Sequence, residues 1–302
     1  MPLGTSHVTK STAATFLPDI WSNEVVAAYQ KNLVAANVFT KMSFTGKKGD
    51  VLHIPSPTRG SASAKAASTQ VNLIAATESE VLVNIDKHYE YSRLIEDIVD
   101  VQGLASLRQF YTSDAGYALA RQVDTDLLQL GRGFNGGNGT AAYNAAYIGS
   151  DGSTLYTSGS PNAAAITDAA IRRTIQRLDD NDVPLDNRFI IIPPVAKNSI
   201  LGNARFTEQA FAGNNVGNIA TGQFGEIYGL KVYVSTNADT ATGGARIALI
   251  GHKDAAVLAE QMGVRSQTQY KQEYLSNLYT SDTIYGVAEL RDNACFALAV
   301  SP

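Results

Sequence analysis

Residues of the types used in catalysis and metal binding occur in the sequence, but their spacing matches no catalytic or metal-binding motif. The four histidines, His7, His53, His88 and His252, stand far apart, with no HExxH motif and no pair at metal-ligand spacing. We therefore expect each histidine to have a structural role.

Other candidate motifs are also incomplete. The glycine-rich residues 131–139 lack the Gly-Lys-Ser/Thr of a phosphate-binding loop and follow a helical pattern instead of a strand. No Gly-x-Ser-x-Gly elbow is present. The acidic residues near position 180 lack the glycine and the final glutamate of a calcium loop, and the single cysteine, Cys295, lies in an apolar run typical of a buried residue. The sequence predicts no metal, no cofactor and no enzymatic activity.

Charged residues separate by sign within the first third of the chain. Residues 41–77 contain one acid, Asp50, and five basic residues: Lys41, Lys47, Lys48, Arg59 and Lys65. Residues 78–100 contain two basic residues and seven acids, which include Glu90, Glu96 and Asp97. Such segments are self-complementary in a head-to-tail array of identical subunits, although two ordinary solvated surfaces would give the same pattern.

A projecting hairpin is predicted where the charge changes sign. Residues 51–54 read as a strand that stops at Pro55 and Pro57, and residues 59–70 are almost all small. Val81, Val83 and Ile85 then alternate with polar and apolar neighbours, as in a strand that pairs back along the first. A long connection without a core of its own must lean on another surface, so we expect this loop to contact a neighbouring subunit.

A long amphipathic helix is predicted over residues 103–130. Its apolar side chains step by three or four: Leu104, Leu107, Tyr111, Ala115, Leu119, Val123, Leu127 and Leu130. At 1.5 Å per residue the helix is roughly 40 Å long and would span a domain as a strut. Gly131, Arg132 and Gly133 would stop it.

The remaining patterns predict an α+β chain. A helix is expected from about Thr167, and strands at residues 188–192, 231–235, 246–250, 267–274, 283–290 and 294–300, with Pro193 and Pro194 closing the first. At 302 residues the chain is long enough for two lobes. A net charge of −4 argues against a dedicated nucleic-acid-binding protein. There is no apolar run of membrane-spanning length and no signal-peptide pattern, so synthesis in a reducing cytoplasm is expected.

Several segments, taken in order, resemble the major capsid proteins of tailed double-stranded DNA phages. They are FLPDIWSNEVV at residues 16–26, GDVLHIP at 49–55, IEDI at 95–98 and GEIYGLKVYVS at 225–235. The resemblance covers nearly the whole chain and implies the Hong Kong 97-type capsid fold. It also implies a structural subunit of the icosahedral head shell around the phage genome, found in the virion capsid after assembly in the host bacterial cytoplasm.

The resemblance also implies a division of the chain. The N-terminal arm, with a short helix, would be residues 1–43, and the extended loop residues 44–80. The peripheral domain, with its spine helix at 103–130, would be residues 81–165 and 253–282. The axial domain, with a mixed central sheet, would be residues 166–252 and 283–302, and residues 206–224 would lie near a symmetry axis.

The partners implied are other copies of the chain in pentamers and hexamers, a portal protein and, in some phages, a cement protein. The chain has no long N-terminal extension of the built-in scaffold type, so a separate scaffolding protein is implied. Lys65 is the only lysine near the loop tip and no cross-linking triad is identified, which implies a shell without covalent links.

Two interpretations stay open for particular residues. Arg108, Arg121 and Arg132, on or just after the long helix, could face packaged DNA through weak nonspecific contact or form pairs between subunits. The loop residues Lys47, Lys48, Arg59 and Lys65 and the acids Glu90, Glu96 and Asp97 are the candidate intersubunit contacts. For the whole protein, the alternatives are a bacterial protein nanocompartment shell of the same fold and a soluble α+β enzyme of unrecognised type.

Overall fold

The computed structural model describes residues 34–44, 46, 48–57, 60–71, 73, 78–97, 106–143, 147–148, 152, 154–157, 163–203 and 225–301. Most of the predicted N-terminal arm, residues 1–33, and the predicted axial loop, residues 206–224, therefore lie outside the described residues.

One layer is a mixed sheet in the order β5-β12-β9-β6-β8-β7. Its strands are β5 (Tyr147–Ile148), β6 (Arg188–Ile192), β7 (Glu226–Ile227), β8 (Leu230–Val234), β9 (Arg246–His252) and β12 (Cys295–Val300). β6 and β12 are buried along their whole length, which explains why residues 189–192 and 295–300 read as uninterrupted apolar runs. β6 pairs with β8 in parallel and with β9 in antiparallel orientation, so the predicted mixed sheet is confirmed.

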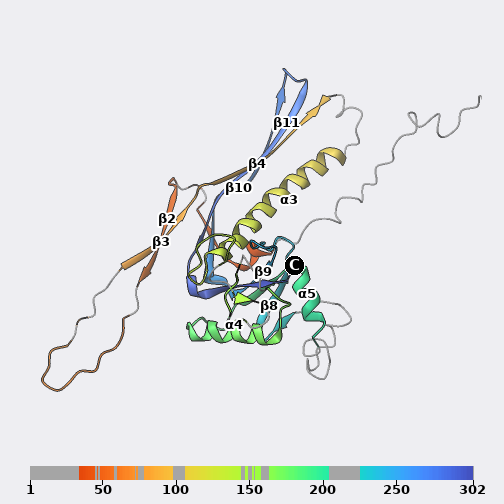
Figure 1. Cartoon of the computed structure of the whole chain (residues 1–302). Helices are drawn as coiled ribbons and strands as arrows, with labels where there is room; N and C mark the ends of the chain where they lie inside the picture. The colour runs from red at the N-terminus through yellow and green to blue at the C-terminus, as the bar shows by residue number, and fades with distance from the viewer. Residues whose placement is uncertain are drawn as a thin grey trace, which may run out of the picture.

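Two helices flank this sheet (Figure 1). α4 (Asp168–Asp180) begins where predicted, and the Thr167 side chain caps it by accepting a hydrogen bond from the Ala170 N–H. α5 (Pro194–Leu201) was not predicted from the sequence. Pro193 and Pro194 do follow the end of β6, as predicted, and Pro194 also occupies the first position of α5, where a missing N–H costs nothing.

The second sheet has the order β1-β10-β11-β4 among the described strands. It contains β1 (Thr40–Ser43), β4 (Lys87–Glu96), β10 (Ala256–Lys271) and β11 (Ser276–Glu289). β10 and β11 form one long hairpin and greatly exceed the predicted strands. Irregular register between Glu260 and Arg265 interrupts the alternation of side chains, which hid the length of β10 from sequence reasoning.

The expected boundary between the peripheral and axial domains at residues 282 and 283 falls inside β11. β11 pairs with β10 and β4 on both sides of that point. The division into domains remains a proposal, and β11 belongs as a whole to the four-stranded sheet.

The predicted hairpin is present as the two-stranded sheet of β2 (Val51–Pro57) and β3 (Glu78–Asn84). β2 does not stop at Pro55 but continues through Pro57, contrary to the sequence-based expectation. The Ile85 N–H donates to the Asp50 carbonyl, so the hydrogen-bonded positions of β2 are the even-numbered ones. Pro55 and Pro57 therefore occupy positions whose missing N–H would point away from β3.

The long helix is α3 (Ser106–Gln129), extended by a 3-10 turn at Leu130–Arg132. On the predicted apolar stripe, Ala115, Leu119 and Leu127 are buried. Leu104 lies outside the described residues. In Figure 1 the helix runs alongside β4 and the β10–β11 hairpin, as expected of a strut. No helix in the described part of the chain is long and apolar enough to cross a membrane.

Candidate assembly surfaces and the junction at the spine helix

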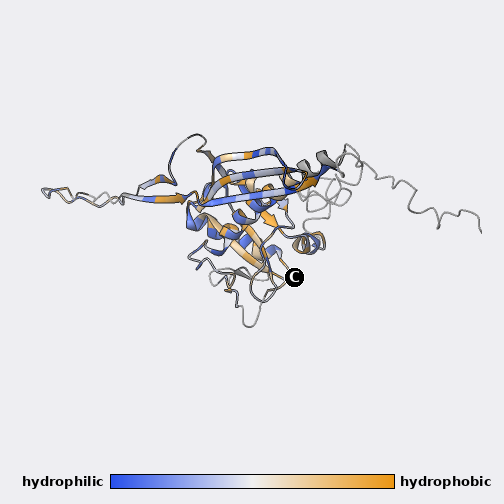
Figure 2. Cartoon of the chain, turned by 90° about the horizontal axis from the view of Figure 1, so that it is seen from above, coloured by the Kyte–Doolittle hydropathy of each residue, from blue (hydrophilic) through white to orange (hydrophobic). Residues whose placement is uncertain are grey.

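The extended loop between β2 and β3 projects away from the rest of the subunit (Figures 1 and 2). Residues 60–71 and 73 are exposed, and Thr69 folds back only on Ala66 within the loop. Val71 is 60% exposed and Leu73 is 92% exposed. Large apolar side chains in this position are what a docking segment presents to a partner.

The predicted basic residues of this region have different outcomes. Lys48 and Lys65 are exposed. Lys47 and Arg59 lie outside the described residues. Sequence reasoning missed Val71 and Leu73, although their one-residue spacing, just after the run of small residues, was a signal that could have identified them.

The acidic residues lie on and just beyond β4. Glu90 and Glu96 are exposed, and they stand opposite Asp282 and Ser276 of β11. Asp97 is used within its own subunit, because its carboxylate accepts a 2.7 Å hydrogen bond from the Tyr270 hydroxyl. Glu90 and Glu96 are therefore better placed than Asp97 to receive a cation from a neighbour.

The two faces of β4 have different surroundings. Two odd-numbered residues contact α3: the Tyr91 hydroxyl donates to Asp114 at 2.8 Å and Lys87 lies 3.3 Å from Asp126. The even-numbered residues are exposed: His88, Glu90, Ser92, Leu94 and Glu96.

We call the even-numbered face of β4, together with the residues opposite it on β11, the open face. Leu94, 47% exposed, stands opposite Leu278 on this face. Glu90 and Glu96 flank Leu94 along β4. The open face therefore has an apolar pair, Leu94 and Leu278, with acidic flanks.

The extended loop and Glu96 of the open face lie at opposite ends of the subunit. β4 starts beside β3 and runs away from the loop toward the β10–β11 turn (Figure 1). The nine residue steps from Lys87 to Glu96 span roughly 30 Å at about 3.4 Å per residue. Within one chain, the loop tip cannot reach Glu96.

α3 carries two buried aspartates that bind different parts of the subunit. Asp124 accepts hydrogen bonds from the backbone N–H groups of Val34, Ala35 and Ala36 and from Asn237. Burial raises the pKa of Asp124, and these four hydrogen bonds oppose that effect.

Asp126 is the second buried aspartate. It accepts hydrogen bonds from Gln122 at 3.0 Å and from the Tyr285 hydroxyl at 2.7 Å, and it pairs with Lys87. Burial, followed by the hydrogen bond to Asp126, raises the pKa of Tyr285. Asp126 therefore holds α3 against the four-stranded sheet.

Arg132, considered as a candidate to face DNA or to pair between subunits, forms a pair inside its own subunit. Its Nε and Nη2 atoms donate to the two carboxylate oxygens of Asp239 at 2.6 and 2.9 Å, and the Tyr143 hydroxyl also donates to Asp239. Burial alone would raise the pKa of Asp239, but the bonds from Arg132 and Tyr143 outweigh it and lower that pKa. This bidentate pair commits the guanidinium of Arg132 to Asp239.

Arg108 and Arg121 remain candidates for contact with DNA or for pairing between subunits. Arg121 is exposed on α3. Arg108 belongs to α3, but its side chain lies outside the described residues.

The described histidines have partners typical of structural residues. His53 bonds Glu80 across the β2–β3 hairpin at 2.8 Å, and His88 lies 3.3 Å from Asp282. Buried His252 accepts a hydrogen bond from the Asp254 N–H. In the part of the chain that the structure describes, no group of three or more His, Cys, Asp or Glu side chains is placed to hold a metal ion.

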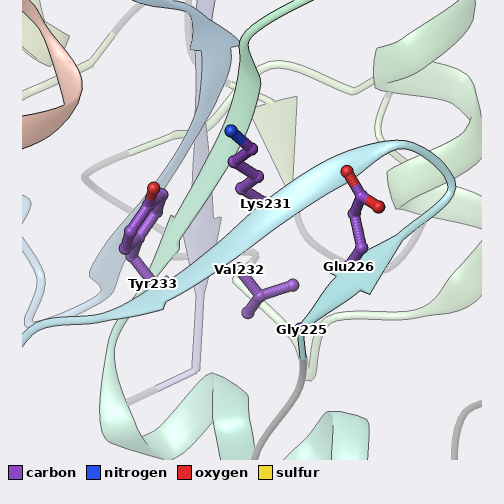
Figure 3. Close-up of a pocket in the computed structure, with 5 residues that line it drawn as sticks. All are labelled: Gly225, Glu226, Lys231, Val232 and Tyr233. Carbon is purple, nitrogen blue, oxygen red and sulfur yellow. The ribbon is translucent and has the colours of Figure 1, made fainter. Parts of the chain in front are cut away.

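A hollow of about 450 Å³ lies at the β7–β8 edge of the mixed sheet, lined by Gly225, Glu226, Lys231, Val232 and Tyr233 (Figure 3). Glu226 and Lys231 stand opposite each other in the register of the two strands.

The fold has close counterparts among solved structures. The capsid structure of the cyanophage P-SCSP1u has a TM-score of 0.73 at 20% identity, covering 99% of this chain and 97% of that chain. A structure from Mycobacterium phage Che8 has a TM-score of 0.72 at 20% identity, covering 94% and 97%. The capsid of Helicobacter pylori bacteriophage KHP30 has a TM-score of 0.71 at 13% identity, covering 99% and 100%. A search of curated proteins found no match.

Together, the projecting hairpin, the long helix beside a four-stranded sheet and the mixed sheet define the class of α+β shell subunits with the Hong Kong 97-type capsid fold. The chain belongs to the phage capsid protein family, whose model matches residues 19–291. It is a structural subunit that self-assembles into a phage capsid shell, and the virion capsid is its location.

Proposed function

We propose that the subunits form the pentamers and hexamers of an icosahedral head around double-stranded DNA, through a head-to-tail contact in which the extended loop of one subunit lies on the open face of the next. The observation that carries this proposal is the separation of two complementary surfaces on one chain. The loop presents exposed Leu73 and Lys65, whereas the open face presents Leu94 between Glu90 and Glu96.

Apolar and charged residues would contribute differently to this contact. Burying a leucine contributes roughly 2 kcal/mol, whereas an exposed ion pair contributes about 0.2–1 kcal/mol. Val71 and Leu73 would therefore supply most of the affinity, and Lys65 with Glu90 or Glu96 would set the register.

Disulfide trapping tests this contact in assembled shells. The only native cysteine, Cys295, is fully buried, so the background is clean. We expect Leu73→Cys combined with Leu94→Cys or Leu278→Cys to give intersubunit disulfide ladders under mild oxidation. The matched control pairs Leu73→Cys with Leu185→Cys, which is 74% exposed in the α4–β6 connection. Equal ladders in both pairs, or ladders in neither, would contradict the contact.

The further partners of this proposal are a separate scaffolding protein, a portal protein, a cement protein where one is present, and packaged DNA through weak contacts. Arg108 and Arg121 are the remaining candidates for these DNA contacts. Assembly would take place in the host cytoplasm, without catalytic turnover and without covalent links between subunits.

Electron microscopy of sedimented material, expressed with and without the neighbouring genes, tests this wider proposal. Closed icosahedral shells tens of nanometres across that require a scaffolding partner are expected. The absence of covalent links predicts that denaturing gels resolve the shells into monomers. A stable small oligomer under every condition would overturn the shell proposal.

A further inference from the structure

The first described helix, α1 (Ala35–Val38), depends on a side chain from a distant part of the chain. Its own N-cap residue, Val34, makes no side-chain capping bond. The N–H groups of Val34, Ala35 and Ala36 instead converge on Asp124 Oδ1, at 3.1, 2.6 and 3.4 Å. A carboxylate on α3 thus satisfies N–H groups that a short helix cannot satisfy by itself.

The second oxygen of the same carboxylate binds a third part of the subunit. Asp124 Oδ2 accepts a 3.3 Å hydrogen bond from Asn237 Nδ2, in the connection between β8 and β9. Asp124 is fully buried, and the Asn237 Oδ1 atom beside it is a buried acceptor without a partner among the described residues. One carboxylate therefore joins α1, α3 and the connection between two strands of the mixed sheet.

Asp124 contributes less to the stability of α1 on the subunit than to the orientation of α1. Val34, Val38 and Phe39 are 4%, 8% and 4% exposed, so apolar packing already holds α1 in place. Placing a carboxylate in such surroundings has a desolvation cost that an apolar residue would avoid. What Asp124 adds is a fixed direction, because three N–H groups that point at one oxygen leave α1 a single orientation.

We propose that Asp124 is a positioning residue that fixes where the chain before residue 34 joins the body of the subunit and couples that point to the β8–β9 connection. This inference rests on the proposed function, in which the subunits assemble into a closed shell. It predicts a loss of accurate assembly in subunits that still fold.

Asp126 provides a matched control two residues further along the same helix. It is 6% exposed, and it binds Lys87 and Tyr285 of the four-stranded sheet instead of α1. Removal of either carboxylate should therefore loosen a different part of the subunit. Because both carboxylates are buried, a general loss of stability would affect both variants alike.

Hydrogen exchange measured by mass spectrometry on unassembled, folded subunits is the first test. In Asp124→Leu we expect the amides of residues 34–36 to exchange at least about tenfold faster, with peptides of β11 unchanged. Asp126→Leu should do the reverse. Asp124→Ala, which removes the carboxylate without adding bulk, is measured in parallel in case the leucine variant does not fold. Unchanged exchange at residues 34–36 in a folded carboxylate-free variant would overturn the proposal, as would equal loosening of both regions by both variants.

Assembly is the second test, and Asp124→Asn is its rescue variant, because an amide oxygen can still accept the three N–H bonds. We expect folded Asp124→Leu or Asp124→Ala subunits to give at least about tenfold fewer closed shells than wild type, and Asp124→Asn to restore the yield. Normal shell yields from a folded carboxylate-free variant would overturn the positioning role. Failure of the wild-type protein to form shells would instead contradict the proposed function.

Discussion

Arg132 and Asp239 form a bidentate ion pair that joins the end of α3 to the connection between β8 and β9. Asn237, which bonds Asp124, lies in the same connection. The long helix is thus attached to the mixed sheet at two points, Asp124 in its C-terminal part and Arg132 just beyond its end.

Removing one member of this pair should destabilise the subunit. We expect Arg132→Leu or Asp239→Leu to lower the free energy of unfolding by about 3 kcal/mol, because each leaves an uncompensated, largely buried charge. The double variant should recover part of that loss. Urea unfolding of unassembled subunits measures it, and losses that simply add in the double variant would contradict a direct coupling.

The same pair predicts a dependence on acid. Bonds from Arg132 and Tyr143 hold the pKa of Asp239 below its unfolded value of 3.8 despite burial. The stabilisation is therefore fully present above pH 3.8 and is lost as the pH falls through the lower pKa of the folded state. In unfolding experiments at pH values down to about 3, Asp239→Asn should show a smaller loss of stability on acidification than wild type.

His252 should make stability depend on pH over a higher range than Asp239 does. Burial lowers its pKa below 6.5, and the attraction of Asp254 only partly offsets that effect. The unfolded chain therefore binds the proton more readily, so stability is highest above pH 6.5 and falls as the pH drops toward the lower folded pKa. Comparing urea midpoints at pH 7.5 and 5.5, we expect a smaller difference in His252→Gln than in wild type; an equal difference would show that other groups control this range.

Two glycines in the long hairpin provide a stringent packing test. A Cβ at Gly286 of β11 would lie 2.3 Å from the Asn84 carbonyl oxygen, a backbone atom, whereas a Cβ at Gly263 of β10 would meet nothing within 4 Å. Gly286→Ala should destabilise the subunit by roughly 1–3 kcal/mol by displacing the end of β3, and Gly263→Ala should be nearly neutral. Thermal unfolding of the two variants checks this contrast, and similar melting temperatures would contradict it.

Charge reversal tests the register of the proposed contact. Arg59→Glu with Lys65→Glu should impair assembly and leave each subunit folded, because both side chains would then meet the acidic flanks of the open face. Glu90→Lys or Glu96→Lys should partly rescue assembly and identify the receiving residue. Sedimentation of assembly reactions measures the yield, and normal shells from the double loop variant would exclude these cations from the contact.

Much of the fold could be predicted because its signals are local. The Thr167 cap, the apolar run of β6 and the alternation of Val81, Val83 and Ile85 each depend on neighbouring residues. α5 was missed because a proline at a helix start resembles a strand stop, and the length of β10 was missed because the irregular register between Glu260 and Arg265 interrupts the alternation of its side chains.

The contacts that Asp124 and Arg132 make at the C-terminal end of α3 could not be predicted, because the partner residues are far apart in the sequence. Asp124 and Val34 are separated by 90 positions, and Arg132 and Asp239 by 107. The sequence did contain one signal, since Asp124 falls three residues before Leu127 on the apolar stripe, where an acid must find buried donors. Nothing in the sequence identified those donors.

The two prolines of β2 have a consequence for subunits that wait to assemble. A two-stranded ribbon that projects into solvent exposes unpaired backbone donors and acceptors, on which strands of other chains could stack without limit. Pro55 and Pro57 remove two donors from the outer edge of β2. The ribbon can thus offer its side chains to one neighbour while its edge resists fibre formation, which keeps free subunits available for closed shells.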